Sequence, residues 1–414
     1  MHNTFLDQEI MVLGAARTAV GKFEGILAPY RATDLGTAAI KAALEQAGVS
    51  PEWVELGSMG IVASGGLGMA PAKTALMGAG VPATVPNRTT ETVCGSGMDA
   101  IAVTCDALAL RVVGLAVAGG MESRTNAPYQ LGPRFIRGGG DYARGARLRM
   151  KRAGAYRFAL DGDEPAQLAG TEIIDATSYD GLFWPGEKKF MREYAVAFAK
   201  AQEYTVGQIN ALAAESHAKA AKATEQGLFG PELVALPGAE ADQLMSPQAQ
   251  QAELERNPED IASAYNASSP ADGGAALVLA SGQAAAQYGL APIARILGYC
   301  RVDGPAADFL SAPVRAVAEL LGALEGGQPP AGKYTIIEAN EAFGVQIPLF
   351  LEHFAGMALN VHGGAIALGH PLGAAGARIT TTLIHAMRRY GHGYGIATLC
   401  YGGGGAYALA VEAR

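Results

Sequence analysis

Two cysteines and a histidine stand in glycine-rich stretches of this chain. Cys94 lies in Val-Cys-Gly-Ser-Gly-Met, His370 lies in Gly-His-Pro, and Cys400 directly precedes Tyr-Gly-Gly-Gly-Gly. Asn340 begins a further stretch, Asn-Glu-Ala-Phe. Together these residues offer a thiol nucleophile, a base that activates it, an amide that stabilises an oxyanion and a second thiol that carries protons. The chemistry that needs this set is the making or breaking of a carbon–carbon bond next to a thioester.

Cys94 stands where an extended segment, 87–93, is expected to meet a helix, 96–110. The start of a helix carries unpaired N–H groups and the positive end of the helix dipole, and both favour a thiolate. We therefore predict a lowered pKa for this thiol. The glycines at 95 and 97 would let an acyl chain approach the backbone. The alternative is a buried structural cysteine, which the glycine context disfavours.

His370 and Asn340 are predicted to assist Cys94. An imidazole at a second glycine-rich helix start can act as the general base, although a lone histidine there would often be a capping or core residue. Asn340 follows an expected strand, 335–338, and one amide donor to an oxyanion is worth about 3–4 kcal/mol of barrier lowering. A turn-forming asparagine is the alternative. His362, shortly before His370, could line the same cavity.

Cys400 lies between two apolar runs, 396–399 and 406–411, that read as strands. Gly402 or a neighbouring glycine could offer a backbone N–H to a thioester oxygen, while the Cys400 thiol removes an α-proton. A buried cysteine in a β-hairpin is the alternative. The two remaining cysteines, Cys105 and Cys300, lie in apolar segments without the glycine-rich context of Cys94 and Cys400 and are interpreted as structural.

The elements around these residues alternate between apolar strands and amphipathic helices, which is typical of a layered α/β protein. We expect strands at 10–16, 60–64 and 112–118 with helices at 33–47, 70–79 and 96–110, and then strands at 293–299 and 335–338 with helices at 313–324, 343–354 and 373–390. In each half a glycine-rich turn feeds a long helix. We interpret this as an internal duplication whose pairing would bring both helix starts together.

The middle of the chain, about 126–262, breaks this alternation. It contains a basic tract from Arg134 to Arg157, one long helix at 205–226, and a polar stretch at 242–260 that reads as irregular. We expect this segment to lie over the core as an excursion. A strand at 275–280 then returns the chain to the first half.

Composition limits the class of protein. A chain of 414 residues that is 50% hydrophobic exceeds one ordinary core, and its net charge of −8 argues against nucleic acid as a partner. No apolar run approaches the roughly 18–20 residues that a membrane span needs, and the N-terminus has no signal-peptide core. Four cysteines without a Cys-x-x-Cys pair argue against a disulfide framework and a zinc site. We expect a cytoplasmic protein with free thiols, no metal and no permanently bound cofactor.

The motifs in this order resemble those of the thiolase family over nearly the whole chain. They are Gly-Ala-Ala-Arg-Thr-Ala-Val-Gly from residue 14, Val-Cys-Gly-Ser-Gly from 93, Gly-Gly-Met-Glu-Ser from 119, Asn-Glu-Ala-Phe from 340, Gly-Gly-Ala-Ile-Ala-Leu-Gly-His-Pro from 363 and Cys-Tyr-Gly-Gly-Gly from 400. The resemblance implies a five-layer αβαβα fold built from two duplicated βαβαβαββ halves. The halves would be 1–126 with 262–290, and 291–414, and a loop domain at 127–261 would cover the site.

The same resemblance implies a role for each residue. Cys94 would be acylated, His370 would activate it, and Cys400 would act as acid and base at the α-carbon of a second thioester. Asn340, with a water and His370, would form one oxyanion hole, and the backbone N–H groups of Cys94 and Gly402 the other. Substrate contacts are expected from a further set: Ser268 toward the pantetheine arm, Met191 toward the acyl group, and Phe343 and His362 beside them.

The resemblance further implies an acyltransferase that catalyses both thiolytic cleavage of 3-ketoacyl-CoA and the reverse Claisen condensation, with CoA and acyl-CoA as substrates. A homodimer or homotetramer is expected. Two other interpretations remain open. A ketosynthase-like condensing enzyme would not need Cys400 in its glycine turn, and a non-catalytic acyl-binding protein of the same fold would tolerate the loss of Cys94 or His370.

Several positions depart from the family pattern. Phe190 and Arg192 flank Met191 where many members have histidine and glycine, and Leu228 stands where a basic residue often contacts the adenine end of CoA. Tyr401 replaces a more common isoleucine, and the segment before Met191 is longer than usual and basic. The specificity of the acetoacetyl-CoA enzymes is therefore not transferred to this chain.

The basic tract from Arg134 to Arg157 suggests a replacement for the missing contact. We hypothesise that its cations bind the phosphates of CoA; a solvated loop or a contact between subunits is the alternative. Reversing the charges of Arg147 and Arg149 should then raise the KM for CoA several-fold, because phosphate attraction turns into repulsion. Steady-state kinetics with varied CoA check this, and an unchanged KM would remove the hypothesis.

Overall fold

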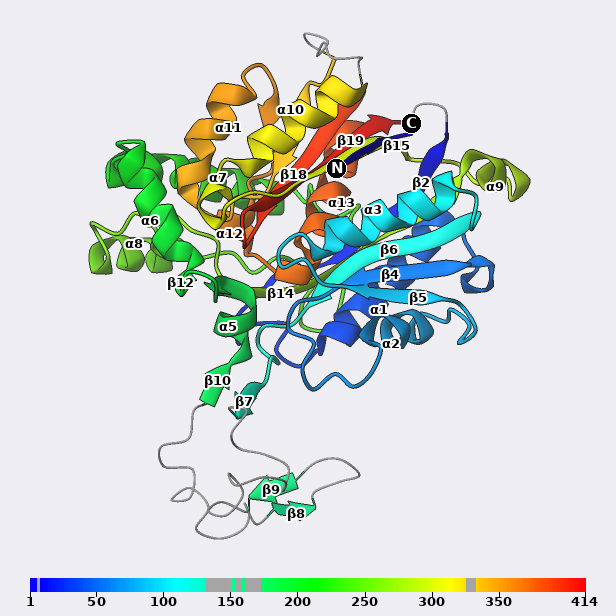
Figure 1. Ribbon diagram of the computed structural model, residues 1–414, viewed down its shortest axis with the longest axis horizontal. Helices are drawn as coiled ribbons and strands as arrows, with labels where there is room; N and C mark the ends of the chain where they lie inside the picture. Colours follow the sequence, from blue (N-terminus) through cyan, green and yellow to red (C-terminus); the bar gives the residue numbers. More distant parts are fainter. Residues whose placement is uncertain (6–7, 132–149, 153–157, 161–172, 325–332) are drawn as a thin grey trace.

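The computed structural model describes residues 1–5, 8–131, 150–152, 158–160, 173–324 and 333–414 (Figure 1). Its first half follows the order strand–helix–strand–helix–strand–helix–strand–strand. These elements are β2 (Ile10–Thr18), α1 (Ala32–Ala47), β4 (Leu56–Gly60), α2 (Pro71–Gly78), β5 (Asn87–Thr90), α3 (Ser96–Ala109), β6 (Leu115–Glu122) and β14 (Ala271–Ser281).

The second half repeats that order. Its elements are β15 (Ala294–Val302), α10 (Ala312–Leu324), β16 (Ile336–Ala339), α11 (Ile347–His353), β17 (Ala358–Leu359), α13 (Ala375–Tyr390), β18 (Tyr394–Tyr401) and β19 (Gly405–Ala413). Short elements complete the halves: β1 (His2–Thr4), β3 (Gly21–Lys22), α9 (Gly282–Gln287), α12 (Ala365–Leu368) and the 3-10 turns η1 (Pro51–Trp53), η3 (Ala306–Asp308), η4 (Gly344–Gln346) and η5 (Leu372–Ala374).

Strand pairing shows that the two halves are duplicates. The strands run in the order β17-β16-β18-β19-β15-β2-β14-β6-β4-β5, which is symmetric about the junction of β15 and β2. On each side of that junction the two inner pairings are antiparallel and the two outer pairings are parallel. The predicted internal duplication is therefore confirmed.

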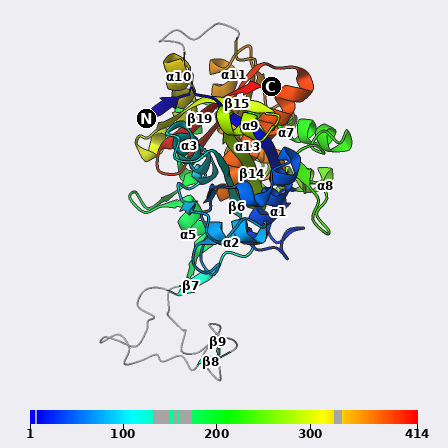
Figure 2. The same cartoon turned by 90° about the vertical axis from the view of Figure 1, so that its right-hand side faces the viewer.

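The helices divide these strands into five layers (Figures 1 and 2). The outer face of the first half packs against α1 and α2, and the outer face of the second half packs against α10 and α11. The inner layer is α3 beside α13, held between the two sets of strands. Almost every residue of α13 from Ala375 to Met387 is buried, as expected of a helix with protein on all sides. The predicted α/β class and αβαβα layering are confirmed.

The excursion between β6 and β14 forms the segment that we call the loop domain. It contains β7 (Tyr129–Leu131), β8 (Met150–Arg152), β9 (Phe158–Leu160), β10 (Ile173–Asp175), α5 (Ala176–Leu182), β11 (Phe183–Trp184), β12 (Lys189–Phe190), α6 (Met191–Ala201), α7 (Val206–Glu225), β13 (Leu233–Val234) and α8 (Pro247–Arg256). The long helix α7 begins with a capping box in which Thr205 and Gln208 each bind the other's backbone N–H.

Three predicted elements need correction. The strand expected at 60–64 lies earlier, as β4, because its glycine-containing sequence gives little strand signal on its own. The helix expected at 343–354 is split into η4 and α11, since Pro348 begins the second piece. The stretch 242–260 is not irregular throughout: Ser246 caps α8, with Pro247 at its first position. No helix in the described ranges is long and apolar enough to cross a membrane.

The inner layer depends on glycines where α3 meets α13. A Cβ added to Gly376 would overlap the backbone nitrogen of Met98, and one added to Gly97 would lie 2.8 Å from the carbonyl oxygen of Gly373. Neither contact can be relieved by rotating a side chain, because both involve backbone atoms. The two helices therefore approach as closely as their backbones allow.

The Gly376→Ala variant should accordingly lose about 1–3 kcal/mol of unfolding free energy through overpacking. Gly322 on α10 provides the control, because nothing lies within 4 Å of an added Cβ there. Gly322→Ala should gain roughly 0.4–1 kcal/mol by restricting the unfolded chain. Urea denaturation measures both. A Gly376→Ala protein that unfolds at the wild-type urea concentration would contradict this packing.

Candidate active site

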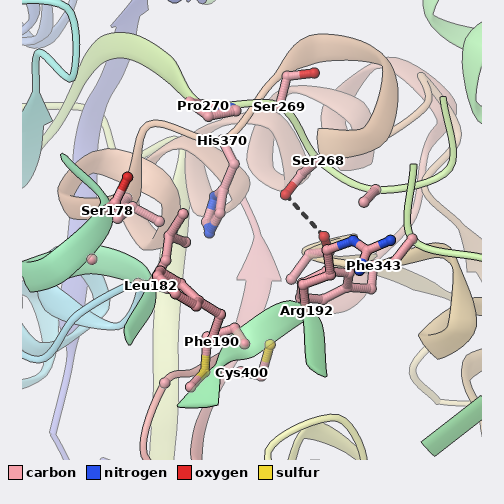
Figure 3. A pocket seen from close by; sticks show the side chains of 18 of the residues that line it. Ser178, Leu182, Phe190, Arg192, Ser268, Ser269, Pro270, Phe343, His370 and Cys400 are labelled. Carbon is pink, nitrogen blue, oxygen red and sulfur yellow. Dashed lines mark hydrogen bonds between the residues drawn. The ribbon is translucent and has the colours of Figure 1, made fainter. Parts of the chain in front are cut away.

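A cavity of about 520 Å³ opens where the two halves meet the loop domain (Figure 3). Cys94, His370 and Cys400 all line it. They come from three separate elements: the turn before α3, the turn before η5, and the end of β18. The sequence prediction that two thiols and one imidazole converge is therefore matched by their placement on one cavity wall.

A strained turn holds Cys94 at this wall. Val93 has a φ of +48°, which is rare for a β-branched residue. Ser96 fixes the turn, because its hydroxyl donates to the Val93 carbonyl at 2.6 Å and accepts from the Thr92 N–H at 2.9 Å. Gly95 is the N-cap residue of α3, which begins at Ser96 as predicted. The chain reverses tightly enough to present the thiol just before the helix starts.

The electrostatics of Cys94 differ from the prediction. Burial raises the pKa of its thiol to about 12, and the nearby Cys400 raises this pKa further. A hydrogen bond from the backbone N–H of Gly402 and the charge of Arg124 lower the pKa but do not offset burial. The prediction of a lowered thiol pKa is therefore wrong, because loss of hydration outweighs the helix start. The resting nucleophile is a neutral thiol.

His370 reaches the cavity through Gly369, whose φ of +102° favours glycine. The His370 N–H donates to the Ser269 carbonyl at 2.9 Å, which ties the turn to the strand leading into β14. Both ring nitrogens are buried without a hydrogen-bond partner in the part of the chain that is described. Burial, followed by the charges of Arg124 and Arg378, lowers the pKa of this imidazole to about 3. The ring is therefore neutral and able to accept a proton.

Cys400 lies in β18 opposite Ala406 of β19, so its backbone position is fixed by the hairpin. The amide nitrogen of Gln346 lies 3.4 Å from the Cys400 sulfur and donates to it. The same amide donates to the Leu310 carbonyl at 3.2 Å, so the Gln346 side chain is itself anchored. Burial raises the pKa of the Cys400 thiol to about 11, and the Gln346 hydrogen bond partly opposes this shift. This second thiol is also neutral at rest.

Asn340 directly follows β16, as predicted, and its N–H donates to the Thr398 carbonyl at 2.9 Å. Its side-chain oxygen accepts from Arg378 at 3.5 Å, which orients the amide. The amide nitrogen is left without a partner among the described residues. Asn340 is fully buried and is not one of the residues that line the cavity. It therefore has a free buried donor that does not itself line the cavity.

The expected substrate-contacting residues separate into two groups. Met191, Ser268 and Phe343 line the cavity, and the Ser268 hydroxyl donates to the Ala342 carbonyl at 2.9 Å (Figure 3). His362 does not reach it.

The His362 ring instead lies edge-on to Phe229, and its Nε2 is 3.1 Å from the hydroxyl of Tyr390. Both neighbours lie outside the cavity lining. Asn360 and Gly363, with φ values of +43° and +75°, reverse the chain around this histidine. The sequence distance to His370 gave no information about this reversal.

Three further residues at the site were not singled out from the sequence. Gln346 contacts Cys400, and Arg124 lines the cavity. Glu122 accepts hydrogen bonds from the N–H groups of Val62 and Ala63 in the first half and of Gly373 in the second. The motif Gly-Gly-Met-Glu-Ser was the sequence feature that could have indicated Glu122. The basic tract from Arg134 to Arg157 lies outside the described residues, apart from the short strand β8.

A duplicated α/β fold that places two thiols and an imidazole on one cavity is the architecture of an acyl-transferring enzyme. Comparison with known families agrees. The model of the thiolase N-terminal domain matches residues 10–283, and that of the thiolase C-terminal domain matches residues 290–413.

Individual relatives extend this comparison over the whole chain. The acetyl-CoA acetyltransferase of Escherichia coli K12 is 36% identical, covering 97% of this chain and 98% of its own. Among solved structures, human mitochondrial 3-ketoacyl-CoA thiolase in complex with CoA matches with a TM-score of 0.84 and 28% identity over 100% of both chains. The Acat5 thiolase of Ascaris suum in complex with coenzyme A has a TM-score of 0.83 and 30% identity over 98% of this chain and 100% of its own. The chain belongs to the thiolase family and is a thiolase-type acyltransferase.

The raised pKa of Cys94 has a measurable consequence. Because the thiol pKa is about 12, the thiolate fraction is small at neutral pH and grows about tenfold per pH unit. Alkylation of Cys94 by iodoacetamide, followed by peptide mass mapping, should therefore accelerate up to about pH 9 without a plateau. A free thiol compound alkylated in parallel controls for the reagent. A plateau near neutral pH would reveal a preformed thiolate and contradict the assignment.

Proposed function

We propose that the protein cleaves and forms 3-ketoacyl-CoA through an acyl group carried on Cys94. The observation that carries this proposal is the placement of Cys94, His370 and Cys400 on one cavity, with a Gly402 N–H bound to Cys94. Each group occurs in the protonation state that the first step requires. The two thiols are protonated and the imidazole is free to accept a proton.

In the cleaving direction, the His370 imidazole takes the Cys94 proton and the sulfur attacks the 3-keto carbon. The bond between carbons two and three breaks, and its electron pair goes to the α-carbon of the departing acetyl-CoA. The Cys400 thiol protonates that carbon. Free CoA then gives its proton to Cys400 and attacks the acyl-cysteine, while Cys94 regains its proton from the imidazolium. Every proton is returned, so the same groups also catalyse condensation.

Two sets of hydrogen-bond donors would stabilise the oxyanions that form in this scheme. We assign one site to the backbone N–H groups of Cys94 and Gly402 and a second to Asn340 acting with His370 through a water. The unpartnered amide nitrogen of Asn340 supports the second assignment. Gln346 is a positioning residue in this scheme, because it holds the Cys400 sulfur by a hydrogen bond.

CoA and its acyl thioesters are proposed as substrates, without a permanently bound cofactor. The human and Ascaris suum relatives were solved with CoA bound. Ser268, Phe343 and Met191 would contact the pantetheine arm and the acyl group, consistent with their places on the cavity wall.

The proposal extends to organisation. Residues 1–126 with 262–290 would form one half, 291–414 the other, and 127–261 the loop domain over the site.

A homodimer or homotetramer is proposed because β5 leaves a strand edge with Arg88 and Thr89 exposed. A molecular mass equal to one chain, measured by light scattering, would contradict this oligomeric state. A cytoplasmic location is proposed from the four free cysteines.

Replacing Cys400 with alanine should separate the two half-reactions. The Cys400→Ala variant should still acquire an acetyl group on Cys94 from acetyl-CoA, because His370 and Gly402 are intact. It should lose condensation by about 10²–10⁴-fold, the usual contribution of general acid–base catalysis. Peptide mass spectrometry and a condensation assay measure these outcomes, with Cys300→Ala as a buried-thiol control.

The result also distinguishes the alternatives. No adduct from any thioester would favour a non-catalytic acyl-binding protein. Condensation that survives in Cys400→Ala would favour a ketosynthase-like enzyme, because such an enzyme does not use the second thiol.

A further inference from the structure

One arginine at the cavity has a charge that no side chain of the described residues pairs. Arg124 is 3% exposed and lines the cavity. Its Nη2 donates to the Thr177 carbonyl at 2.5 Å, while its Nε is buried without a partner. Among the described residues no carboxylate lies within ion-pair distance of it. The other arginine at the cavity, Arg192, is paired with Asp260 at 2.7 Å.

The carboxylates nearest to Arg124 are engaged elsewhere. Glu122 accepts three backbone N–H groups. Asp175 caps α5 through the Thr177 N–H and the Ser178 hydroxyl. Asp272 accepts from the N–H and hydroxyl of Thr125. The negative charges of these carboxylates reduce the free-energy cost of burying the Arg124 cation. None of these carboxylates accepts a hydrogen bond from the guanidinium.

Arg124 belongs to the α5 side of the cavity. It is bound to α5, whose residues Ser178 and Leu182 lie on one side of the His370 ring (Figure 3). Ser268 and Arg192 lie on the other side of that ring (Figure 3). If the pantetheine arm enters past Ser268, the acyl group beyond the reacting carbon extends toward Arg124.

A simple alkyl chain would suit this side of the cavity poorly. It would exclude water from the guanidinium without supplying an acceptor, and an unpaired buried charge is costly. A carboxylate would supply the missing anion through charge-assisted hydrogen bonds. Near the arginine the wall is neutral, since a Cβ added to Gly181 would lie 4.0 Å from the Arg124 Nη2, and the apolar Leu182 and Leu372 also line the cavity. A chain of methylenes that ends in a carboxylate matches both features.

We propose that Arg124 selects acyl groups that end in a carboxylate, so that the preferred substrates are CoA thioesters of 3-keto dicarboxylic acids. This inference rests on the proposed thiolytic function. It assigns Arg124 a role in specificity, at the end of the acyl group remote from the bond that breaks.

The test compares pairs of 3-ketoacyl-CoA substrates with equal carbon number, one ending in methyl and one in carboxylate, over a series of chain lengths. At the best length, the full-length enzyme should cleave the carboxylate member with a kcat/KM about 10–100-fold higher, the range expected of a hydrogen bond to a charged group. The Arg124→Gln variant should bring this ratio close to one, and Arg124→Lys should retain part of it. Arg192→Gln is the matched control and should keep the wild-type ratio.

The ratio is measured within one preparation, so a partly misfolded variant lowers both rates and leaves the ratio intact. A wild-type enzyme that shows no preference for the carboxylate at any length would overturn the proposal. So would an Arg124→Gln variant that keeps the ratio. Acetylation of Cys94 by acetyl-CoA is followed in the same samples. Its absence would refute the proposed function itself, whereas acetylation without a carboxylate preference refutes the role of Arg124 alone.

Discussion

The close approach of two helix starts, one from each duplicated half, is the constraint on which the site depends. Gly97 and Gly376 allow α3 and α13 to meet backbone to backbone. Glu122 strengthens the same junction, since its buried carboxylate accepts N–H groups from both halves. Cys94 immediately precedes one of these helices, and His370 precedes the turn into the other. A loss of this junction would separate Cys94 from His370, the proposed nucleophile and base.

Burial at that junction sets the chemistry. Loss of hydration raises the pKa of both thiols and lowers the pKa of the imidazole, so neither thiol forms a charged pair with the imidazole at rest. In the proposed mechanism, charge develops only once a thioester is bound, and the Gly402 N–H and the Asn340 amide are the donors assigned to stabilise it. In this proposal the fold positions the two thiols and the imidazole in advance, and these groups ionise only when the substrate is bound.

The sequence predicted the parts of this arrangement that depend on local pattern. Alternating elements and repeated glycine turns predicted the duplicated layers, and the motifs around Cys94, His370 and Cys400 predicted their shared cavity. Properties that depend on three-dimensional surroundings were not predictable. The prediction for the thiol pKa of Cys94 was wrong because the sequence of a helix start does not reveal how deeply the thiol is buried. The prediction for His362 was wrong because a chain reversal directs its ring toward Phe229 and Tyr390. Gln346 and Arg124 carry no motif signal that indicates a site.

The central claim is that the sulfurs of Cys94 and Cys400 face one substrate-sized space. Cross-linking with dibromoacetone, a short reagent that joins two thiols through a three-carbon bridge, tests it most directly. Peptide mapping should find one bridged pair, Cys94 with Cys400, and prior acetylation of Cys94 should prevent the bridge. Single adducts alone, or a bridge from either sulfur to Cys105 or Cys300, would show that the two thiols do not share the site and would contradict the account.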